Sequence, residues 1–270
     1  MLKDITFGQY YQTKSPIHSL DPRIKIILMI IFIVFIFLSG NIFALLFSAI
    51  SVFLVLFVSR VPLKLYFKNM KAILPVLIFT AIINLFYGDG GTVLVEFWKL
   101  SITTDGVYKA VFMATRIMLL IFISSALTYT TTPNDLTDAI ESLLSPLKFI
   151  GLKSAVHTLA MMMTIALRFI PTLIEEAEKI MNAQKARGAD LESGGLIERV
   201  KALIPILIPL LISSVRRAYE LAEAMECRCY NGGEGKTRMK QMKLSKLDLY
   251  LSLIAVIMCG AVVLLNIFLY

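Results

Sequence analysis

The sequence predicts an all-α integral membrane protein with about five transmembrane helices and a helical cytoplasmic region. Three observations support this prediction. Of the 270 residues, 57% are hydrophobic and only 17% are charged, far from the composition of a soluble domain. The mean hydropathy is +0.77. Long stretches also lack any charge, and the longest of them, residues 26–59, is too long for one crossing of a bilayer.

Two helices, about 24–39 and 42–59, account for that longest run. As a single helix it would measure roughly 51 Å, whereas one crossing needs only ~20 residues. Ser39-Gly40-Asn41 lies in the middle and is typical of a tight turn. A third span is expected near 72–88, where Pro75 should kink the helix or shift its first turn.

A loop is expected over 88–106, followed by a fourth span at about 107–129. The last span covers about 249–270. Cytoplasmic loops carry an excess of Lys and Arg, and here the basic residues gather in the amino-terminal segment and in 60–71 rather than in 88–106. We therefore expect a multi-pass protein of the cell membrane, with the amino terminus in the cytoplasm and the carboxyl terminus outside.

The chain divides into three regions by composition. Residues 1–132 hold four spans, and residues 236–270 combine a basic linker with the last span. Residues 133–235 lie between them and mix charged with apolar residues, which predicts a cytoplasmic insertion. A short helix should open this insertion, capped by Thr132 or Asn134 and ended by Ser145-Pro146.

Two long amphipathic helices follow in the insertion. The first is expected over Lys153–Arg187, with an interruption at Pro171, and the second over about Leu196–Arg228, with prolines in its apolar half. They close on Ala186-Arg187-Gly188 and on Cys227-Arg228-Cys229. An arginine near a helix carboxyl terminus also interacts favourably with the helix macrodipole, by ~0.3–1 kcal/mol. This interaction is enough to explain either arginine taken alone. Two similar ends favour recognition of carboxylates on a partner, for which a forked guanidinium is suited.

Composition also disfavours several functions. Nucleic-acid binding would need a basic patch on a soluble face, and the sequence shows none. Three cysteines (Cys227, Cys229 and Cys259) and two histidines (His18 and His157) predict neither a disulfide framework nor a metal site. Arg116 lies near one end of the fourth span, where pairing with a carbonyl or a Glu of the bundle is favoured over a relay. Without intramembrane ion pairs or a catalytic cluster, a stand-alone secondary transporter or a membrane enzyme is disfavoured.

Several segments carry a family resemblance, and they extend along nearly the whole chain: His18-Ser19-Leu20-Asp21-Pro22-Arg23-Ile24-Lys25, Thr104-Asp105-Gly106, Arg116, Thr131-Thr132-Pro133-Asn134-Asp135-Leu136, Leu144-Ser145-Pro146-Leu147, Leu167-Arg168-Phe169-Ile170-Pro171, Ala183 to Asp190, and Arg217 to Glu226. In order and spacing they resemble the transmembrane T-component of energy-coupling factor (ECF) transporters, which import vitamins and metals in prokaryotes.

The resemblance implies a scaffold without catalytic activity and without a cofactor of its own. Two partner ABC-type ATPase subunits would bind ATP-Mg and dock on the ends of two cytoplasmic coupling helices, at Ala186, Arg187, Gly188 and at Cys227, Arg228, Cys229. The first signature is intact. The second departs from the family, because Cys227 and Cys229 stand where Ala and Gly are usual, and a left-handed helix ending costs Cys more than Gly.

The resemblance also implies one or more membrane-embedded S-components that bind the substrate. Contact with an S-component is expected at Leu144, Pro146, Met161, Met162, Pro171, Pro205 and Pro209. Asp21, Pro22, Arg23 and Arg116 form the family's structural motif. Uptake of vitamins or other micronutrients is the function implied, and a T-component dedicated to cobalt or nickel is the alternative that the sequence leaves open.

Overall fold

The computed structural model describes residues 9–86, 92–97, 100–146, 153–189, 195–231 and 244–268. Tertiary contacts divide the chain into two units. The bundle unit comprises Gln9–Thr132 and Gln241–Tyr270, and the arm unit comprises Pro133–Lys240 with Met1–Gly8. Residues 236–243 of the expected basic linker lie outside the described residues.

Most helices of the bundle unit lie where the sequence predicted them. The helices of this unit are α1 (Pro16–Ser19), α2 (Pro22–Leu38), α3 (Ile42–Ser59), α4 (Leu63–Phe86), α5 (Thr104–Thr130) and α9 (Lys246–Phe268). α2 begins where it does because the Asp21 carboxylate accepts the Arg23 N–H at 2.9 Å and Pro22 occupies the first turn. α5 begins before residue 107 because the Thr103 hydroxyl accepts the Gly106 N–H at 3.1 Å.

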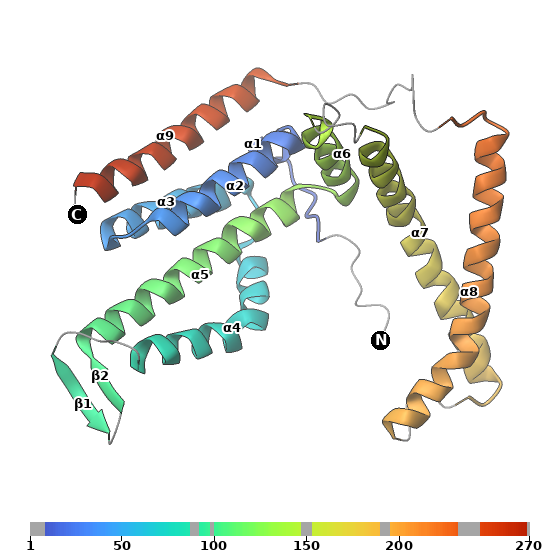
Figure 1. Cartoon of the computed structure of the whole chain (residues 1–270), viewed down its shortest axis with the longest axis horizontal. Helices are drawn as coiled ribbons and strands as arrows, with labels where there is room; N and C mark the ends of the chain where they lie inside the picture. The colour runs from blue at the N-terminus through green and yellow to red at the C-terminus, as the bar shows by residue number, and fades with distance from the viewer. Residues whose placement is uncertain are drawn as a thin grey trace. The chain divides into compact units, whose positions relative to one another are not determined.

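Two predictions between residues 60 and 106 need correction. α4 starts at Leu63 rather than near 72, so Pro75 lies well inside it, and the ribbon changes direction along its length (Figure 1). The expected loop contains an antiparallel hairpin of β1 (Val93–Phe97) and β2 (Leu100–Thr103), in which Phe97 pairs with Leu100. β-Branched and aromatic residues in this segment favour strands, whereas the flanking glycines are typical of a loop.

The core of the bundle unit forms where α2, α3, α5 and α9 pack around one another. Its most buried apolar side chains are Ile36, Val52, Leu56, Tyr66, Leu119 and Phe122. The Tyr66 ring meets the edge of Tyr129 at a centroid distance of 5.1 Å, which fixes α4 against α5. Many large apolar side chains point outward instead, and Phe57 is 85% exposed. An apolar exterior of this kind suits a lipid environment.

Six of the described helices are long and apolar enough to cross a membrane: α3, α4, α5, α9 and most of α7 and α8. The expected count of about five is close. The six helices are not the expected five with one added. α2, with 17 residues, is too short to be among the six, and α7 and α8 come from the region expected in the cytoplasm. Length and composition alone do not separate a spanning helix from an amphipathic one.

The arm unit contains α6 (Pro133–Leu143), α7 (Lys153–Ala186) and α8 (Leu196–Glu226). α6 begins at Pro133, so Thr132 precedes it and Asn134 lies within its first turn. The predicted interruption of α7 at Pro171 is wrong, since the helix continues through this proline. α6 packs on α7, where His157 Nδ1 lies 3.3 Å from Glu141 Oε1.

Candidate functional site

α7 and α8 run antiparallel and cross in the arm unit (Figure 1). Towards one end, Gln184 Nε2 donates to the Pro205 carbonyl at 3.5 Å. Towards the other, the Tyr230 hydroxyl donates to Met161 Sδ at 2.7 Å. Because residue numbers rise along one helix as they fall along the other, the carboxyl ends of the two helices lie at opposite ends of the pair.

A polar cluster joins the two helices between these contacts. Arg217 donates to Glu176 Oε2 at 2.6 Å, and the Ser213 hydroxyl donates to Glu176 Oε1. The side chains of Glu176 and Arg217 are 22% and 35% exposed, so the pair is only partly screened by solvent. Charge-assisted hydrogen bonds are strong and directional, so this cluster fixes the register of α7 against α8.

The carboxyl end of α7 closes in a left-handed residue. Gly188 has φ +86°, and its N–H reaches the Lys185 carbonyl at 3.0 Å. The next N–H, of Ala189, returns to the Gln184 carbonyl at 3.0 Å. These two bonds form the Schellman ending, which satisfies the last carbonyls of the helix. Arg187 is the residue immediately before the left-handed one.

The carboxyl end of α8 repeats this geometry with a different residue. Cys229 has φ +54°, its N–H reaches the Glu226 carbonyl at 2.9 Å, and the Tyr230 N–H returns to the Met225 carbonyl at 3.1 Å. The replacement of Gly by Cys therefore leaves the chain exit unchanged, at the cost of a left-handed conformation that L residues disfavour. Arg228 again lies immediately before the left-handed residue, between two exposed thiols.

Arg187 and Arg228 are both exposed, and neither side chain has an interaction partner among the residues that the structure describes. Arg187 lies eleven residues after Glu176, and Arg228 lies eleven residues after Arg217. Each helix thus extends by about 16 Å from the ion pair to its arginine, at ~1.5 Å per residue. The arm unit presents two matched arginines at opposite ends of one antiparallel pair.

The residues expected to contact an S-component are spread over the arm unit. Pro146, Met162, Pro171, Pro205 and Pro209 are exposed, and Met162 is 61% exposed. Leu144 is half-buried. Met161 is also half-buried and already receives the Tyr230 hydroxyl, so it serves packing within the unit.

A more continuous apolar surface lies on the apolar half of α8, where Pro205 and Pro209 alone were expected from the sequence to be contact residues. It is exposed along one side of the helix, and we call it the aliphatic stripe: Ile197, Val200, Ile204, Leu207, Leu211 and Val215. Spacings of three and four residues place these side chains on one face, so their periodicity was visible in the sequence.

The structural motif lies in the bundle unit, where it joins the ends of three helices. The buried Asp248 carboxylate accepts the backbone N–H groups of Asp21 at 3.1 Å and of Ser245 at 2.7 Å. Lys25 donates to the carbonyls of Thr130 at 2.9 Å and His18 at 3.2 Å. Arg23, next to Pro22, uses its backbone N–H on the Asp21 cap. This polar cluster ties α2, α5 and α9 together.

His18 belongs to the same cluster, and its burial favours the neutral form. Its Nε2–H donates to the Tyr11 carbonyl at 3.0 Å, which leaves Nδ1 to accept the Ser15 hydroxyl at 2.7 Å. Burial lowers the pKa of His18 below its ordinary value, the Tyr11 hydrogen bond opposes this shift, and the positive charge of Lys25 adds to it.

Arg116 lies in the middle of α5 and not near one end as expected, but it pairs with a carbonyl of the bundle as expected. Its guanidinium donates to the Ser39 carbonyl in the α2–α3 turn and lies 4.8 Å from the centre of the Phe112 ring. In the same turn, Asn266 donates to the Leu38 carbonyl at 2.9 Å and accepts the Gly40 N–H at 3.1 Å. Backbone groups near lipid must be satisfied within the protein, and these two side chains do so.

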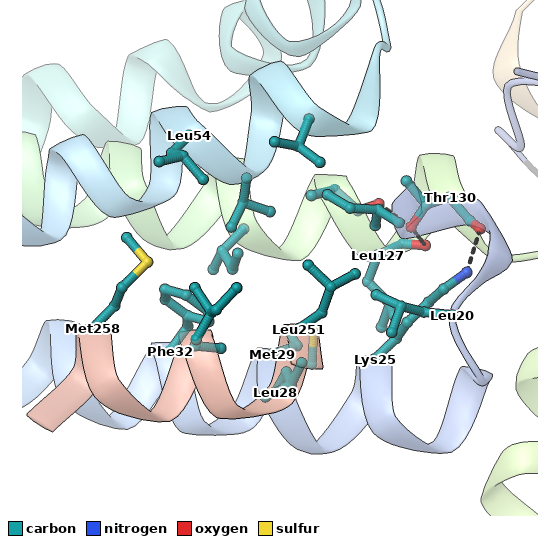
Figure 2. A pocket seen from close by; sticks show the side chains of 17 residues that line it. Leu20, Lys25, Leu28, Met29, Phe32, Leu54, Leu127, Thr130, Leu251 and Met258 are labelled. Atoms are coloured by element: carbon teal, nitrogen blue, oxygen red, sulfur yellow. Dashed lines mark hydrogen bonds between the residues drawn. The ribbon is translucent and has the colours of Figure 1, made fainter. Parts of the chain in front are cut away.

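An apolar cavity of about 120 Å³ lies between α2, α3, α5 and α9 (Figure 2). Phe32, Leu54 and Met258 are among its lining residues, and the charged one among them is Lys25, which donates to Thr130 at one end. A cavity of this composition suits hydrocarbon and not a polar solute.

The sequence of this chain is similar to those of known transport proteins. Residues 13–239 match the family CbiQ, described as cobalt transport protein. Proteins named energy-coupling factor transporter transmembrane protein EcfT are 52% identical in Ruminiclostridium cellulolyticum, over 98% of both chains, and 51% identical in Clostridium kluyveri, over 96% of this chain and 95% of the relative. The chain belongs to this family of energy-coupling factor transporter transmembrane proteins. The family expected from the motifs is thereby confirmed, and with it a role in membrane transport.

Proposed function

We propose that this chain is a non-catalytic scaffold that couples ATP hydrolysis by two ABC-type ATPase subunits to reorientation of a substrate-binding S-component. One observation carries the proposal: two exposed arginines stand at opposite ends of an antiparallel helix pair, on helix ends closed by the same hydrogen bonds. The partner subunits would bind ATP-Mg and hydrolyse it. This chain would transmit the resulting motion and would need no nucleotide site of its own.

The chemistry of the two ends suits docking on proteins. A guanidinium offers planar, paired donors to a carboxylate, and Arg187 and Arg228 have no partner among the described residues that would compete for them. The Schellman endings turn the chain sharply away after each arginine and so leave the helix tip free to enter a groove. Two tips separated by twice about 16 Å fit two subunits rather than one.

The S-component would dock on the apolar parts of the arm unit. Exposed contiguous apolar surface marks a site of interaction with protein or lipid. The aliphatic stripe of α8 supplies such a surface, and Met162 of α7 adds an adaptable side chain. Movement of the ATPases would then be transmitted along α7 and α8 to a small membrane protein that carries a vitamin or another micronutrient.

The decisive test is charge reversal at both ends. Arg187→Glu with Arg228→Glu should abolish co-purification of the ATPase subunits from detergent-solubilised membranes, because both docking carboxylates would meet a like charge. Membrane insertion should be unchanged. Normal co-purification of the ATPases with the double variant would contradict the assignment.

A matched control uses exposed basic residues on the same helices. Lys179→Glu with Arg216→Glu makes the same change of charge away from the helix ends. This variant should retain both ATPases. Equal loss in the control would indicate that net charge, and not the two tips, holds the partners.

A T-component dedicated to cobalt or nickel is a second candidate, favoured by the description of the matched family. The number of small hydrophobic proteins that co-purify with the tagged chain separates the two. Several S-components indicate sharing among vitamins, and a single one with a metal site indicates dedication.

We also propose that the amino terminus lies in the cytoplasm and the carboxyl terminus outside, from the distribution of Lys and Arg. Alkaline phosphatase fused after Tyr270 should be active. An inactive fusion at normal expression would show that the last span has the opposite orientation.

A further inference from the structure

The first turns of α4 carry a row of basic side chains that make no hydrogen bond or ion pair within the described part of the chain and that the proposed docking does not use. Lys64, Lys68 and Lys71 are spaced by four and three residues, which places them on one face of the helix. Arg60 precedes them at the left-handed residue that ends α3. All four are exposed. We call the three lysines and Arg60 the basic row.

Among the side chains that the structure describes in the bundle unit, no anion balances the basic row. None of its four side chains has a partner among the described residues, and α4 contains no acidic residue from Leu63 to Phe86. Asp21 and Asp248 are buried and already accept hydrogen bonds. Asp105 lies at the other end of α4, because the start of α5 approaches Leu85 whereas its end approaches Leu65.

An exposed apolar face lies beside the basic row. Leu63, Phe67 and Leu74 are 47%, 50% and 44% exposed, and helical geometry places them together, about 100° from the lysines. The remaining side of the helix faces the bundle, where Tyr66 is fully buried. Basic and apolar faces side by side are the signature of a helix that lies in a membrane interface.

We propose that the basic row binds the phosphate headgroups of anionic phospholipids, while Leu63, Phe67 and Leu74 enter the acyl region beside them. Lysine side chains suit this geometry, since their stems cover apolar surface while the ammonium reaches the headgroups. A lipid is favoured over an acidic protein because the helix continues from Lys71 into a charge-free segment that reaches Phe86. This inference is independent of the proposed function.

The bend of α4 supports the same placement. Pro75 follows the last lysine by four residues, and its missing N–H frees the carbonyl of Lys71 from the helix ladder. The segment before the proline can therefore follow the bilayer surface while the segment after it enters the hydrocarbon region. The direction change visible in α4 agrees with this division (Figure 1).

The test uses the full-length chain in vesicles of phosphatidylcholine with a minor fraction of spin-labelled phosphatidylglycerol or spin-labelled phosphatidylcholine. Electron paramagnetic resonance reports the fraction of each lipid that the protein immobilises. A single basic residue near a charged surface contributes about a fivefold preference. We expect the wild-type chain to prefer phosphatidylglycerol several-fold, and this preference to fall as salt rises.

Lys64→Gln/Lys68→Gln/Lys71→Gln should remove most of that preference. Lys109→Gln/Lys179→Gln/Lys201→Gln makes the same change in net charge at exposed lysines elsewhere and should retain it. The arginine version of the first triple should also retain it, and it keeps the proposal testable if the glutamine variant fails to fold. Equal losses in the two glutamine triples, or an unchanged preference in the first, would overturn the proposal. So would loss of a co-purifying acidic protein with lipid preference unchanged.

Discussion

The bundle unit and the arm unit are built on opposite principles. In the bundle unit, apolar side chains fill a core between four helices, and buried polar clusters tie the helix ends together. In the arm unit, the buried residues among those described are few: Thr137, Ala139, Val156, Ala160 and Ile206. Its long helices keep their register through one polar cluster and a few end contacts.

This difference indicates that the bundle unit provides stability, whereas the arm unit provides surfaces for recognition. A packed core with satisfied polar groups resists change, so mutations in the bundle unit should lower stability. Helices that expose their apolar and basic groups contribute little to that stability but leave surfaces for partners. Mutations in the arm unit should therefore change docking and coupling before they change unfolding.

The largest effect is expected from Asp248→Ala in the bundle unit. Asp248 is 2% exposed, and its carboxylate accepts two backbone N–H groups, of which the buried one of Asp21 would lose its partner in the variant. Loss of both bonds should lower the free energy of unfolding by about 3 kcal/mol. Thermal unfolding in detergent measures it, and Asp105→Ala, at an exposed aspartate, is the control. Similar midpoints for both variants would show that the cluster is not a source of stability.

Glu176→Gln should affect the arm unit chiefly through function. The variant removes the ion pair with Arg217 and should cost about 1 kcal/mol, since the pair is partly exposed. In proteoliposomes we expect fewer substrate molecules transported for each ATP hydrolysed, with the ATPases still bound. The charge swap Glu176→Arg/Arg217→Glu should restore part of this ratio. A swap that behaves no better than the single variant would argue against the pair as the joint between the helices.

The two helix ends permit a comparison within the arm unit itself. Gly188→Ala should weaken the end of α7 by about 1 kcal/mol, and Cys229→Gly should strengthen the end of α8 by a similar amount. Nothing lies within 4 Å of a Cβ added at Gly188, so the cost there comes from the backbone alone. Hydrogen exchange at the Ala189 and Tyr230 amides measures both effects. If exchange became faster at both amides, or slower at both, the two helix ends would not share the same left-handed geometry.

The smallest effect concerns pH and the bundle unit. Because burial lowers the pKa of His18 in the folded state, the unfolded chain binds its proton first as pH falls below about 6.5. The stability that neutral His18 provides is present above that pH and is lost as pH falls through the folded pKa. Thermal midpoints between pH 7 and pH 5 should fall less in His18→Gln than in the wild type, and identical slopes would exclude His18 as the cause.

Local signals predicted most of the helices. The charge-free run divided at Ser39-Gly40-Asn41 into α2 and α3, and the second of these matches its prediction at both ends. Local signals misled where two of them competed. Pro171 was expected to interrupt α7, but the helix continues through it. Pro75 was expected to kink its helix or shift the first turn, and it lies well inside α4, which changes direction along its length (Figure 1). A proline removes one hydrogen bond, and packing elsewhere retains the rest of the helix.

The sequence by itself determined the membrane class, the approximate helix ranges and the two arginine ends, because charge, hydropathy and helix-ending residues act over a few neighbouring positions. Only the tertiary structure decided that α7 and α8 run antiparallel about Glu176 and Arg217, and that Asp248 caps the chain at Asp21, 227 residues away. Such pairings depend on which helix faces meet in space. The periodicity of either helix alone leaves that choice open.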